Sequence, residues 1–495
     1  MKLNSCDLLI VTSPVVDTDK PLQAPAVLKA VTEKHGYKTC IEDINFKFLR
    51  STHKDIEFLK QYFRHGTTDD YEKISVAEDY VSDIAKDLLL KYLPMFIAIS
   101  VFTYQSQTFA LLLAQNLRQL NPDIKIIFGG QGLTTSGIES RHSWAQECKD
   151  LGLIDFYIIS EGENAIVDVL TKGHGKGINN PDWEQSRNID DNPYPIYDDY
   201  ALENYDKKSL MITGSRGCVR HCTFCDIHKH WQRFVYRSGL SIAKEMIFQS
   251  KKYGIYDFSF TDSLINGSMK AYRDFIKNIA EHNNTAEHKL TWGGQFIVRG
   301  IKSMTAEDWK ITKQSGANRL YLGVESGSES VRNHMKKQFS NKDLDEFMEQ
   351  AYINEIPVEF LMIVGYPTET EQDFQENIKM FQRYKKYRKI FQNIILGSTL
   401  GILPGTPLEE ELKNDIDMNG GENFWVYNKN PKLDFRERIK RRFLIGDACL
   451  DLGYNVGNNT EDYKMLHFLW NIYKNKQKQN LVDMNTSELH MQKYS

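Results

Sequence analysis

The stretch GSRGCVRHCTFCDIH, residues 214–228, is the most informative part of the chain. Its cysteines, Cys218, Cys222 and Cys225, have the spacing C-x3-C-x2-C directly after an apolar strand candidate, so one loop could wrap a metal centre. Iron–sulfur clusters are held by cysteine thiolates, normally four for each [4Fe–4S] unit. Three protein thiolates would leave one iron open to a chelating substrate. The spacing therefore favours catalysis over simple electron transfer.

A zinc site is the main alternative for the same cysteines. Zinc would need a fourth ligand, for which His221 and His228 are close in sequence. Zinc sites usually combine two C-x2-C pairs, however, and no second pair occurs in the chain. The other cysteines stand singly in apolar or mixed surroundings, and we expect them to be buried thiols; they are Cys6, Cys40, Cys148 and Cys449.

The sequence around and after the cysteines alternates apolar runs with helical patterns. The strand candidates are residues 209–213, 256–262, 289–296, 319–325, 357–365 and 392–400. Six such units predict a partial (β/α)6 barrel of the TIM type over residues 207–410. In that architecture the chemistry lies at the carboxyl ends of the strands.

The cysteine loop, with Phe224 just before its last cysteine, resembles the signature of the radical S-adenosylmethionine (SAM) superfamily. The resemblance implies a [4Fe–4S] cluster on the three cysteines, with SAM chelating the open iron. An electron from an external donor of the flavodoxin or ferredoxin type would then cleave SAM to a 5′-deoxyadenosyl radical. By the same resemblance, the SAM contacts are expected at Phe224, Asp262, Ser263, Gln295, Glu325, Ser326 and Gly365.

One of these positions departs from the common family pattern. FTDSLING places Asp262 and Ser263 where many members have Gly-Gly-Glu, and it looks like the version in cobalamin-associated members. Each strand-end residue alone is a weak signal, because an acidic residue there is more often a helix N-cap than a ligand.

Residues 1–172 form a separate pattern of near-continuous apolar strands and helices. This predicts a Rossmann-like, doubly wound parallel sheet, in which ligands lie at the carboxyl ends of the strands. GxGxxG and P-loop motifs are absent, which disfavours dinucleotide and nucleoside triphosphate binding. A Pro- and Asp-rich stretch, residues 173–206, reads as a linker.

The order of these segments before the cysteine loop looks like the cobalamin-binding half of B12-dependent radical SAM enzymes. The candidate cobalamin contacts are Ser13, Ser100, Thr103, Gly129, Gly130, Gly132, Glu161 and Gly162. The glycines would let a bulky ligand approach the backbone. A histidine ligand of the Asp-x-His-x-x-Gly kind is absent, since the His-x-x-Gly at residues 174–177 has Lys172 in place of the aspartate. A structural domain that has lost cobalamin is the alternative.

Charge and hydropathy fit a cytoplasmic protein. The net charge is -4, which gives no basic excess for nucleic acid, and no signal peptide or membrane-length apolar run appears. Residues 411–495 are expected to be a helical C-terminal region and tail. Its basic run, residues 436–442, reads as a solvated helix face.

Together these features predict a cobalamin-dependent radical SAM methyltransferase that methylates an unactivated carbon of a small molecule or peptide. The second hypothesis is a cyclase or rearrangement enzyme of the same class, like the anaerobic porphyrin-ester cyclases, without methyl transfer. The third is a non-catalytic iron–sulfur protein, which would ordinarily have four cysteines.

Overall fold

The computed structural model describes residues 5–65, 70–133, 138–300, 302–397, 400–418 and 424–457. The chain divides into two compact units. The first is Met1–Ile212 with Ile227–Arg237 and Glu245–Asp257, and the second is Thr213–Asp226, Ser238–Lys244 and Phe258–Ser495. In the described ranges, no helix is both long and apolar enough to cross a membrane.

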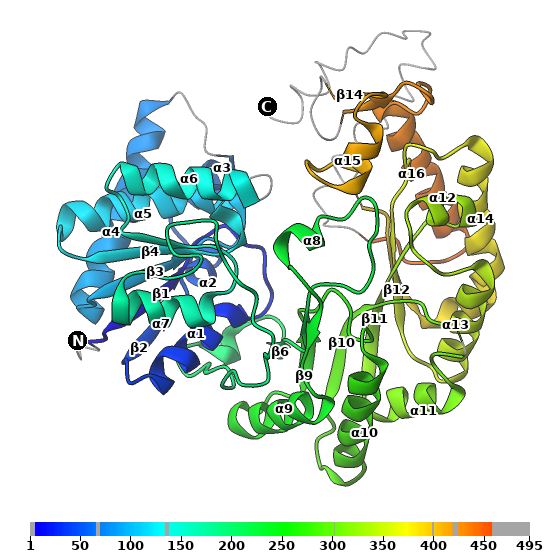
Figure 1. Ribbon diagram of the computed structural model, residues 1–495, viewed down its shortest axis with the longest axis horizontal. Helices are drawn as coiled ribbons and strands as arrows, with labels where there is room; N and C mark the ends of the chain where they lie inside the picture. The colour runs from blue at the N-terminus through cyan, green and yellow to red at the C-terminus, as the bar shows by residue number, and fades with distance from the viewer. Residues whose placement is uncertain are drawn as a thin grey trace. The chain divides into compact units, whose positions relative to one another are not determined.

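The first unit is built on a five-stranded parallel sheet with the order β2-β1-β3-β4-β5. Figure 1 shows α4, α5 and α6 on one face of this sheet and α1 and α7 on the other. The elements are β1 (Leu8–Thr12), α1 (Gln23–Lys34), β2 (Thr39–Glu42), α2 (Ile44–Leu49), α3 (Ile56–His65), α4 (Tyr71–Tyr92), β3 (Phe96–Ser100), α5 (Gln107–Leu120), β4 (Lys125–Gly129), α6 (Ile138–Asp150), β5 (Phe156–Ile158) and α7 (Gly162–Lys172). The predicted doubly wound sheet is confirmed.

The strand order reverses direction between β1 and β3. β1 pairs with β2 on one side and with β3 on the other, so the connections on the two sides of this point wind to opposite faces. In open parallel sheets such a switch point, at the carboxyl ends of the strands, is where ligands bind. The loops after β1 and β3 therefore frame the place where a ligand is expected.

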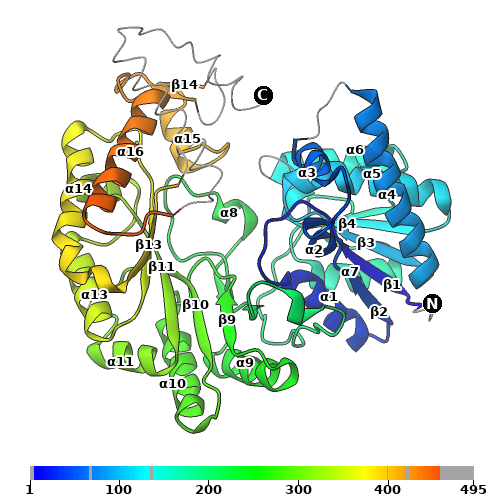
Figure 2. The same cartoon turned by 180° about the vertical axis from the view of Figure 1, so that it is seen from behind.

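The second sheet has six strands in the order β13-β12-β11-β10-β9-β6, so each strand lies beside its predecessor in the chain. Its elements are β6 (Ser209–Ile212), α9 (Gly239–Tyr253), β9 (Asp257–Phe260), α10 (Met269–Thr285), β10 (Thr291–Phe296), α11 (Ala306–Gln314), β11 (Ala317–Glu325), α12 (Glu329–His334), α13 (Asn341–Ile353), β12 (Val358–Met362), α14 (Glu371–Tyr384) and β13 (Phe391–Ile395). Figure 2 shows α10, α11, α13 and α14 along one side of the strands. In the part of the chain that is described, the barrel is open, as predicted.

Three of these helices begin with the same local device. Thr305, Ser340 and Thr370 each accept a hydrogen bond from the backbone three residues later, where an aspartate side chain binds back to the cap. Such capping boxes satisfy backbone donors that a helix end would otherwise leave unpaired. They fix the first residues of α11, α13 and α14. The loops that precede these helices therefore end at defined positions.

The C-terminal part contains α15 (Pro407–Leu412), the short pair β14 (Ile416–Asp417) and β15 (Val426–Tyr427), and α16 (Phe435–Asp451). The expected solvated face on residues 436–442 is wrong, because Arg438, Arg441 and Arg442 are buried. The Arg438 guanidinium lies 3.7 Å from the Trp425 ring centroid and donates to two backbone carbonyls. These arginines hold α16 (Figure 1) onto the second unit. The tail predicted at the end of residues 411–495 lies outside the described residues, which stop at residue 457.

Candidate active site

The cysteine loop follows β6 and leaves its three thiols partly accessible. Cys218, Cys222 and Cys225 are all half-buried, free cysteines. The backbone curls tightly, since the Cys225 N–H donates to the Cys222 carbonyl at 3.2 Å and the Arg220 N–H to Cys218 Sγ at 3.4 Å. The second bond would stabilise negative charge on the Cys218 sulfur.

Burial raises the pKa of the Cys218 and Cys222 thiols. Thiolates at this loop are therefore poorly stabilised by water and need positive charge nearby. The Arg220 N–H at Cys218 and the Lys337 ammonium near Cys222 act in that direction. Iron bound by the three sulfurs would supply the rest of the positive charge that stabilises the thiolates. The donor set therefore fits an iron–sulfur cluster.

A single metal ion is a poorer fit to the described residues. Within them, no three His, Cys, Asp or Glu side chains gather in a way that could hold one ion. In a [4Fe–4S] cluster each thiolate binds a different iron, so the sulfurs need not converge on one point. The geometry gives the zinc alternative no support.

Thr223 ties the loop to three other segments. Its hydroxyl lies 2.9 Å from Tyr366 Oη, which lies 3.0 Å from His334 Nδ1. Its N–H donates to the Met335 carbonyl at 3.2 Å, and its own carbonyl accepts from Leu408 at 2.9 Å. Thr223 and Tyr366 are fully buried, so these bonds are shielded from water and fix the loop firmly.

Lys337 and Glu325 form an ion pair beside the cysteines. Lys337 Nζ lies 3.0 Å from Glu325 Oε1, and both side chains are nearly enclosed. Glu325 ends β11 with a left-handed φ of 65°, which an ordinary residue adopts only when its surroundings impose it. Burial alone would lower the pKa of Lys337, but Glu325 and the thiols of Cys222 and Cys218 raise it, so the side chain is a cation. Glu325 is one of the SAM contacts expected from the sequence, whereas Lys337 is not among them.

Phe224 belongs to the same neighbourhood. The Lys337 ammonium lies 5.9 Å from its ring centroid. The structure therefore brings together Phe224 and Glu325, two of the predicted SAM contacts, with two of the predicted cluster cysteines.

Asp262 binds the backbone segment that leads into the cysteine loop. Its Oδ2 accepts from the Gly214 N–H at 2.8 Å and its Oδ1 from the Ser215 hydroxyl at 2.6 Å. The side chain is buried, whereas the neighbouring Ser263 is exposed. Of this predicted pair, Asp262 orders the backbone that leads into the cysteines and Ser263 is open to a ligand.

The other predicted SAM contacts differ in their surroundings. Gln295 is half-buried at the end of β10. Ser326 is fully buried, and its hydroxyl lies within hydrogen-bonding distance of Asn377 and the Ser328 N–H. Gly365 has a φ of 77°, and a Cβ there would lie 2.4 Å from Arg438 Cγ, so packing of α16 already requires glycine.

The predicted cobalamin residues lie in the loops at the carboxyl edge of the first sheet. Gly129 has open space where a Cβ would stand. After β3, Phe102 and Tyr104 are 42% and 53% exposed, which is unusual for aromatic side chains at a sheet edge. Ser100 and Thr103 are half-buried beside them. This edge therefore exposes aromatic surface beside an open position at Gly129.

Other residues of that prediction have partners within the protein. Ser13 is buried and donates to the Ser106 carbonyl at 2.9 Å, and Glu161 accepts from the Ser186 N–H at 2.6 Å. Gly162 begins α7, and a Cβ there would lie 3.1 Å from the Leu28 side chain.

Gly130 and Gly132 are explained by chain packing. A Cβ on Gly130 would lie 2.4 Å from the Val101 carbonyl oxygen, and one on Gly132 would lie 2.1 Å from that of Thr103. The loops after β3 and β4 thus approach too closely for any side chain. A ligand is not needed to account for either glycine.

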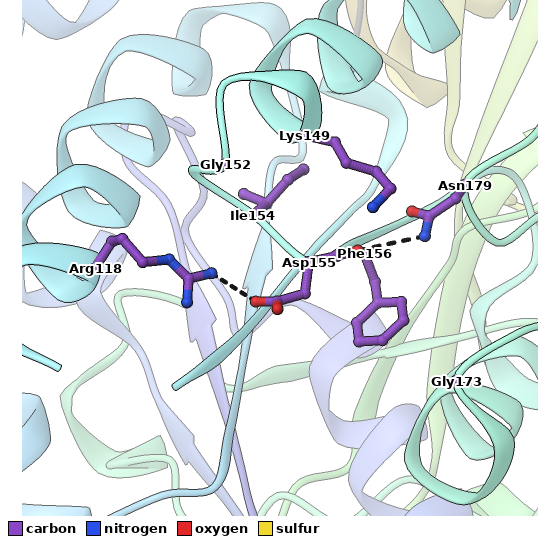
Figure 3. A pocket seen from close by; sticks show the side chains of 8 residues that line it. All are labelled: Arg118, Lys149, Gly152, Ile154, Asp155, Phe156, Gly173 and Asn179. Carbon is purple, nitrogen blue, oxygen red and sulfur yellow. Dashed lines mark hydrogen bonds and ion pairs between the residues drawn. The ribbon is translucent and has the colours of Figure 1, made fainter. Parts of the chain in front are cut away.

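A pocket of about 600 Å³ lies at the opposite, amino-terminal edge of the same sheet. Its lining residues are Arg118, Lys149, Gly152, Ile154, Asp155, Phe156, Gly173 and Asn179. Figure 3 shows the Arg118 guanidinium turned to Asp155, at 2.6 Å, and the Asn179 amide turned to the Asp155 carbonyl. These polar groups bind one another. The pocket is remote from the carboxyl edge where ligands of such sheets bind.

Comparison with known proteins shows which families and folds the chain resembles. Residues 212–381 match the Radical SAM superfamily. The chain is 25% identical over 333 residues to an uncharacterized methyltransferase, PH0819, of Pyrococcus horikoshii, a match that covers 62% of this chain and 68% of the relative. It is 22% identical over 395 residues to cytidylyl-2-hydroxyethylphosphonate methyltransferase of Streptomyces wedmorensis, which covers 69% and 68%.

Two solved structures share the fold over most of the chain. The radical SAM methyltransferase TsrM of Kitasatospora setae superposes with a TM-score of 0.62 at 14% identity, covering 89% of both chains. The cobalamin-dependent radical SAM enzyme OxsB superposes with a TM-score of 0.63 at 17% identity, covering 86% of this chain and 64% of OxsB.

The predicted cluster and SAM are the cofactors that this superfamily uses. Residues 212–381 thus form a domain of the Radical SAM superfamily, and the chain shares the fold of TsrM and OxsB.

Proposed function

We propose that the protein is a cobalamin-dependent radical SAM methyltransferase that acts on an unactivated carbon. The observation that carries the proposal is the pairing of two sites in one chain. The second unit has a three-thiol loop beside the Glu325–Lys337 pair. The first has a switch-point edge with open space at Gly129 and exposed aromatics after β3. Relatives named as methyltransferases support the choice of reaction.

In this proposal Cys218, Cys222 and Cys225 hold the cluster. When bound, the cluster and SAM supply a 5′-deoxyadenosyl radical, and cobalamin supplies a methyl group. Phe224 and Glu325, which both lie near Lys337, would contact SAM, as would the exposed Ser263 and the half-buried Gln295. Thr223 and Asp262 keep the loop rigid, so the thiols stay in a fixed arrangement.

At the first unit, Ser100, Thr103 and Gly129 would lie against the cobalamin together with Phe102 and Tyr104. Ser13, Gly130, Gly132, Glu161 and Gly162 would shape the loops behind this surface through the contacts described above. The boundaries proposed for the modules are residues 1–172, 173–206, 207–410 and 411–495. A low-potential external reductant is required.

The test is anaerobic reconstitution of the full chain with iron, sulfide and hydroxocobalamin, followed by SAM and titanium(III) citrate. S-adenosylhomocysteine and 5′-deoxyadenosine should both form. A variant with all three loop cysteines changed to alanine should bind no iron and make no 5′-deoxyadenosine. If the wild-type protein makes 5′-deoxyadenosine without S-adenosylhomocysteine, methyl transfer is wrong.

That outcome would favour a second candidate, a cyclase or rearrangement enzyme of the same class. The chain is 23% identical over 241 residues to the anaerobic magnesium-protoporphyrin IX monomethyl ester cyclase of a Synechocystis species, covering 45% of this chain and 46% of the cyclase. The match covers less of both chains than the methyltransferase matches do, so we rank it second.

A further inference from the structure

The segment His334–Gln338 is joined to the cysteine loop by hydrogen bonds at several points. The Met335 carbonyl accepts from Thr223, and the His334 ring binds Tyr366, the other partner of the Thr223 hydroxyl. Further along, Gln338 accepts a hydrogen bond from the Arg220 guanidinium. Lys336 and Gln338 have φ values of 59° and 55°, in the left-handed region. Such strain persists only where surrounding contacts impose it.

Lys337 is a residue of this segment whose positive charge acts on the thiols of Cys218 and Cys222. Its side chain is 13% exposed and that of Glu325 is 11% exposed. The space for the pair comes from Gly323 in β11, where a Cβ would stand 2.5 Å from Glu325 Oε1 and 3.1 Å from Lys337 Nζ. A side chain at position 323 would therefore displace the pair. Lys336, the preceding residue, is exposed.

Stability alone is a weak reason for such a pair. Burying two charges costs solvation that their attraction only partly offsets, and apolar residues of similar volume often serve the fold as well. What distinguishes Lys337 is that its charge interacts with Cys222 and Cys218 as well as with Glu325. An ammonium has three donors, so one bond to Glu325 leaves two for other acceptors.

We propose that Lys337 is a positioning residue that places positive charge beside the cluster and makes the cluster easier to reduce. The inference rests on the proposed cluster site. The reduced cluster carries one more negative charge than the oxidised one, the electron coming from the external donor. A nearby cation stabilises the reduced form more, and the effect is large where water is excluded. Glu325, the negative charge of the pair, has the opposite effect and makes the cluster harder to reduce.

The experiment measures the midpoint potential of the SAM-free cluster by EPR-monitored redox titration, with iron and sulfide counted for each variant of the full chain. Lys337→Gln should shift the potential to more negative values, and Glu325→Gln should shift it to more positive values. Lys337→Arg should stay close to wild type. Lys336→Gln, which removes the same charge from an exposed neighbour, should leave the potential unchanged.

The opposite signs separate electrostatics from a purely structural role, which would disturb the cluster in the same way in both variants. Full iron loading with an unchanged potential in Lys337→Gln overturns the inference. If Lys337→Gln loses iron, retention of iron and potential in Lys337→Arg supports it, and loss of iron in Lys337→Arg overturns it. A wild-type protein that assembles no [4Fe–4S] cluster instead overturns the proposed function itself, and this inference with it.

Discussion

At the scale of single residues, Asp262 shows how a side chain can serve a site by supporting its backbone. Replacing Asp262 with alanine would leave the buried Gly214 N–H without its acceptor, whereas the Ser215 hydroxyl would keep the Leu264 carbonyl as an acceptor. Each buried unsatisfied group costs about 1–3 kcal/mol. We expect Asp262→Ala to lower the free energy of unfolding of the second unit by that order, and to reduce iron bound per chain, as measured by urea denaturation and iron assay.

Ser263→Ala is the matched control, because Ser263 is the exposed neighbour in the same loop. It should leave the unfolding curve and iron content unchanged. If Asp262→Ala also unfolds like wild type and binds full iron, the supporting role is wrong, and a direct contact with SAM becomes the better account of this residue.

At the scale of secondary-structure elements, α16 depends on a buried carboxyl group. Glu369 is fully buried and binds Arg441 of α16 at 3.0 Å. Burial raises the pKa of Glu369 to about 7, against an ordinary value of 4.5, although Arg441 opposes the shift. A carboxyl group whose pKa is raised by folding stabilises the fold while protonated, so this contribution is complete below pH 4.5 and is lost as the pH rises through about 7.

Glu369→Gln should remove this pH dependence. Relative to the variant, wild type should lose up to about 3 kcal/mol of unfolding free energy between pH 4.5 and 8, measured by urea unfolding at each pH. Glu371→Gln changes a partner of Arg441 that is 65% exposed, and should keep the wild-type slope. Parallel curves for wild type and Glu369→Gln would contradict the assignment.

Elements also show what the sequence could predict. Most strands of the first sheet were predictable because they are short apolar runs, as in β1, where every residue is buried. α4 carries the ordinary helical signal, because its buried residues, among them Ala77, Val81 and Ala85, are spaced one turn apart. Its place against the sheet depends on contacts with α5 that sequence periodicity does not reveal.

The same limit applies to the site. The spacing of Cys218, Cys222 and Cys225 follows directly from the sequence, because one short loop carries all three. Lys336 and Lys337 are adjacent and identical in type, and only tertiary packing exposes one and encloses the other. The reason for Gly130 was also out of reach, since the Val101 carbonyl that excludes a side chain there lies on a different strand connection.

At the scale of the whole molecule, the two units should carry separable cofactor sites. Gly129 ends β4, and a Cβ there would have no atom within 4 Å, so Gly129→Phe adds a ring at the carboxyl edge of the first sheet from an open position. We expect this variant to retain less than a tenth of the cobalamin that wild type retains after gel filtration, read from the visible spectrum. Iron content and 5′-deoxyadenosine formation should remain, because the cysteine loop belongs to the other unit.

Lys149→Phe is the control, because it adds the same ring to the pocket of Figure 3, at the amino-terminal edge of the same sheet. It should keep full cobalamin retention. The reverse result, with cobalamin lost in Lys149→Phe and kept in Gly129→Phe, would move the ligand to the amino-terminal edge and contradict the switch-point assignment. Loss of iron in Gly129→Phe would show that the two sites depend on one another, which their place in separate units argues against.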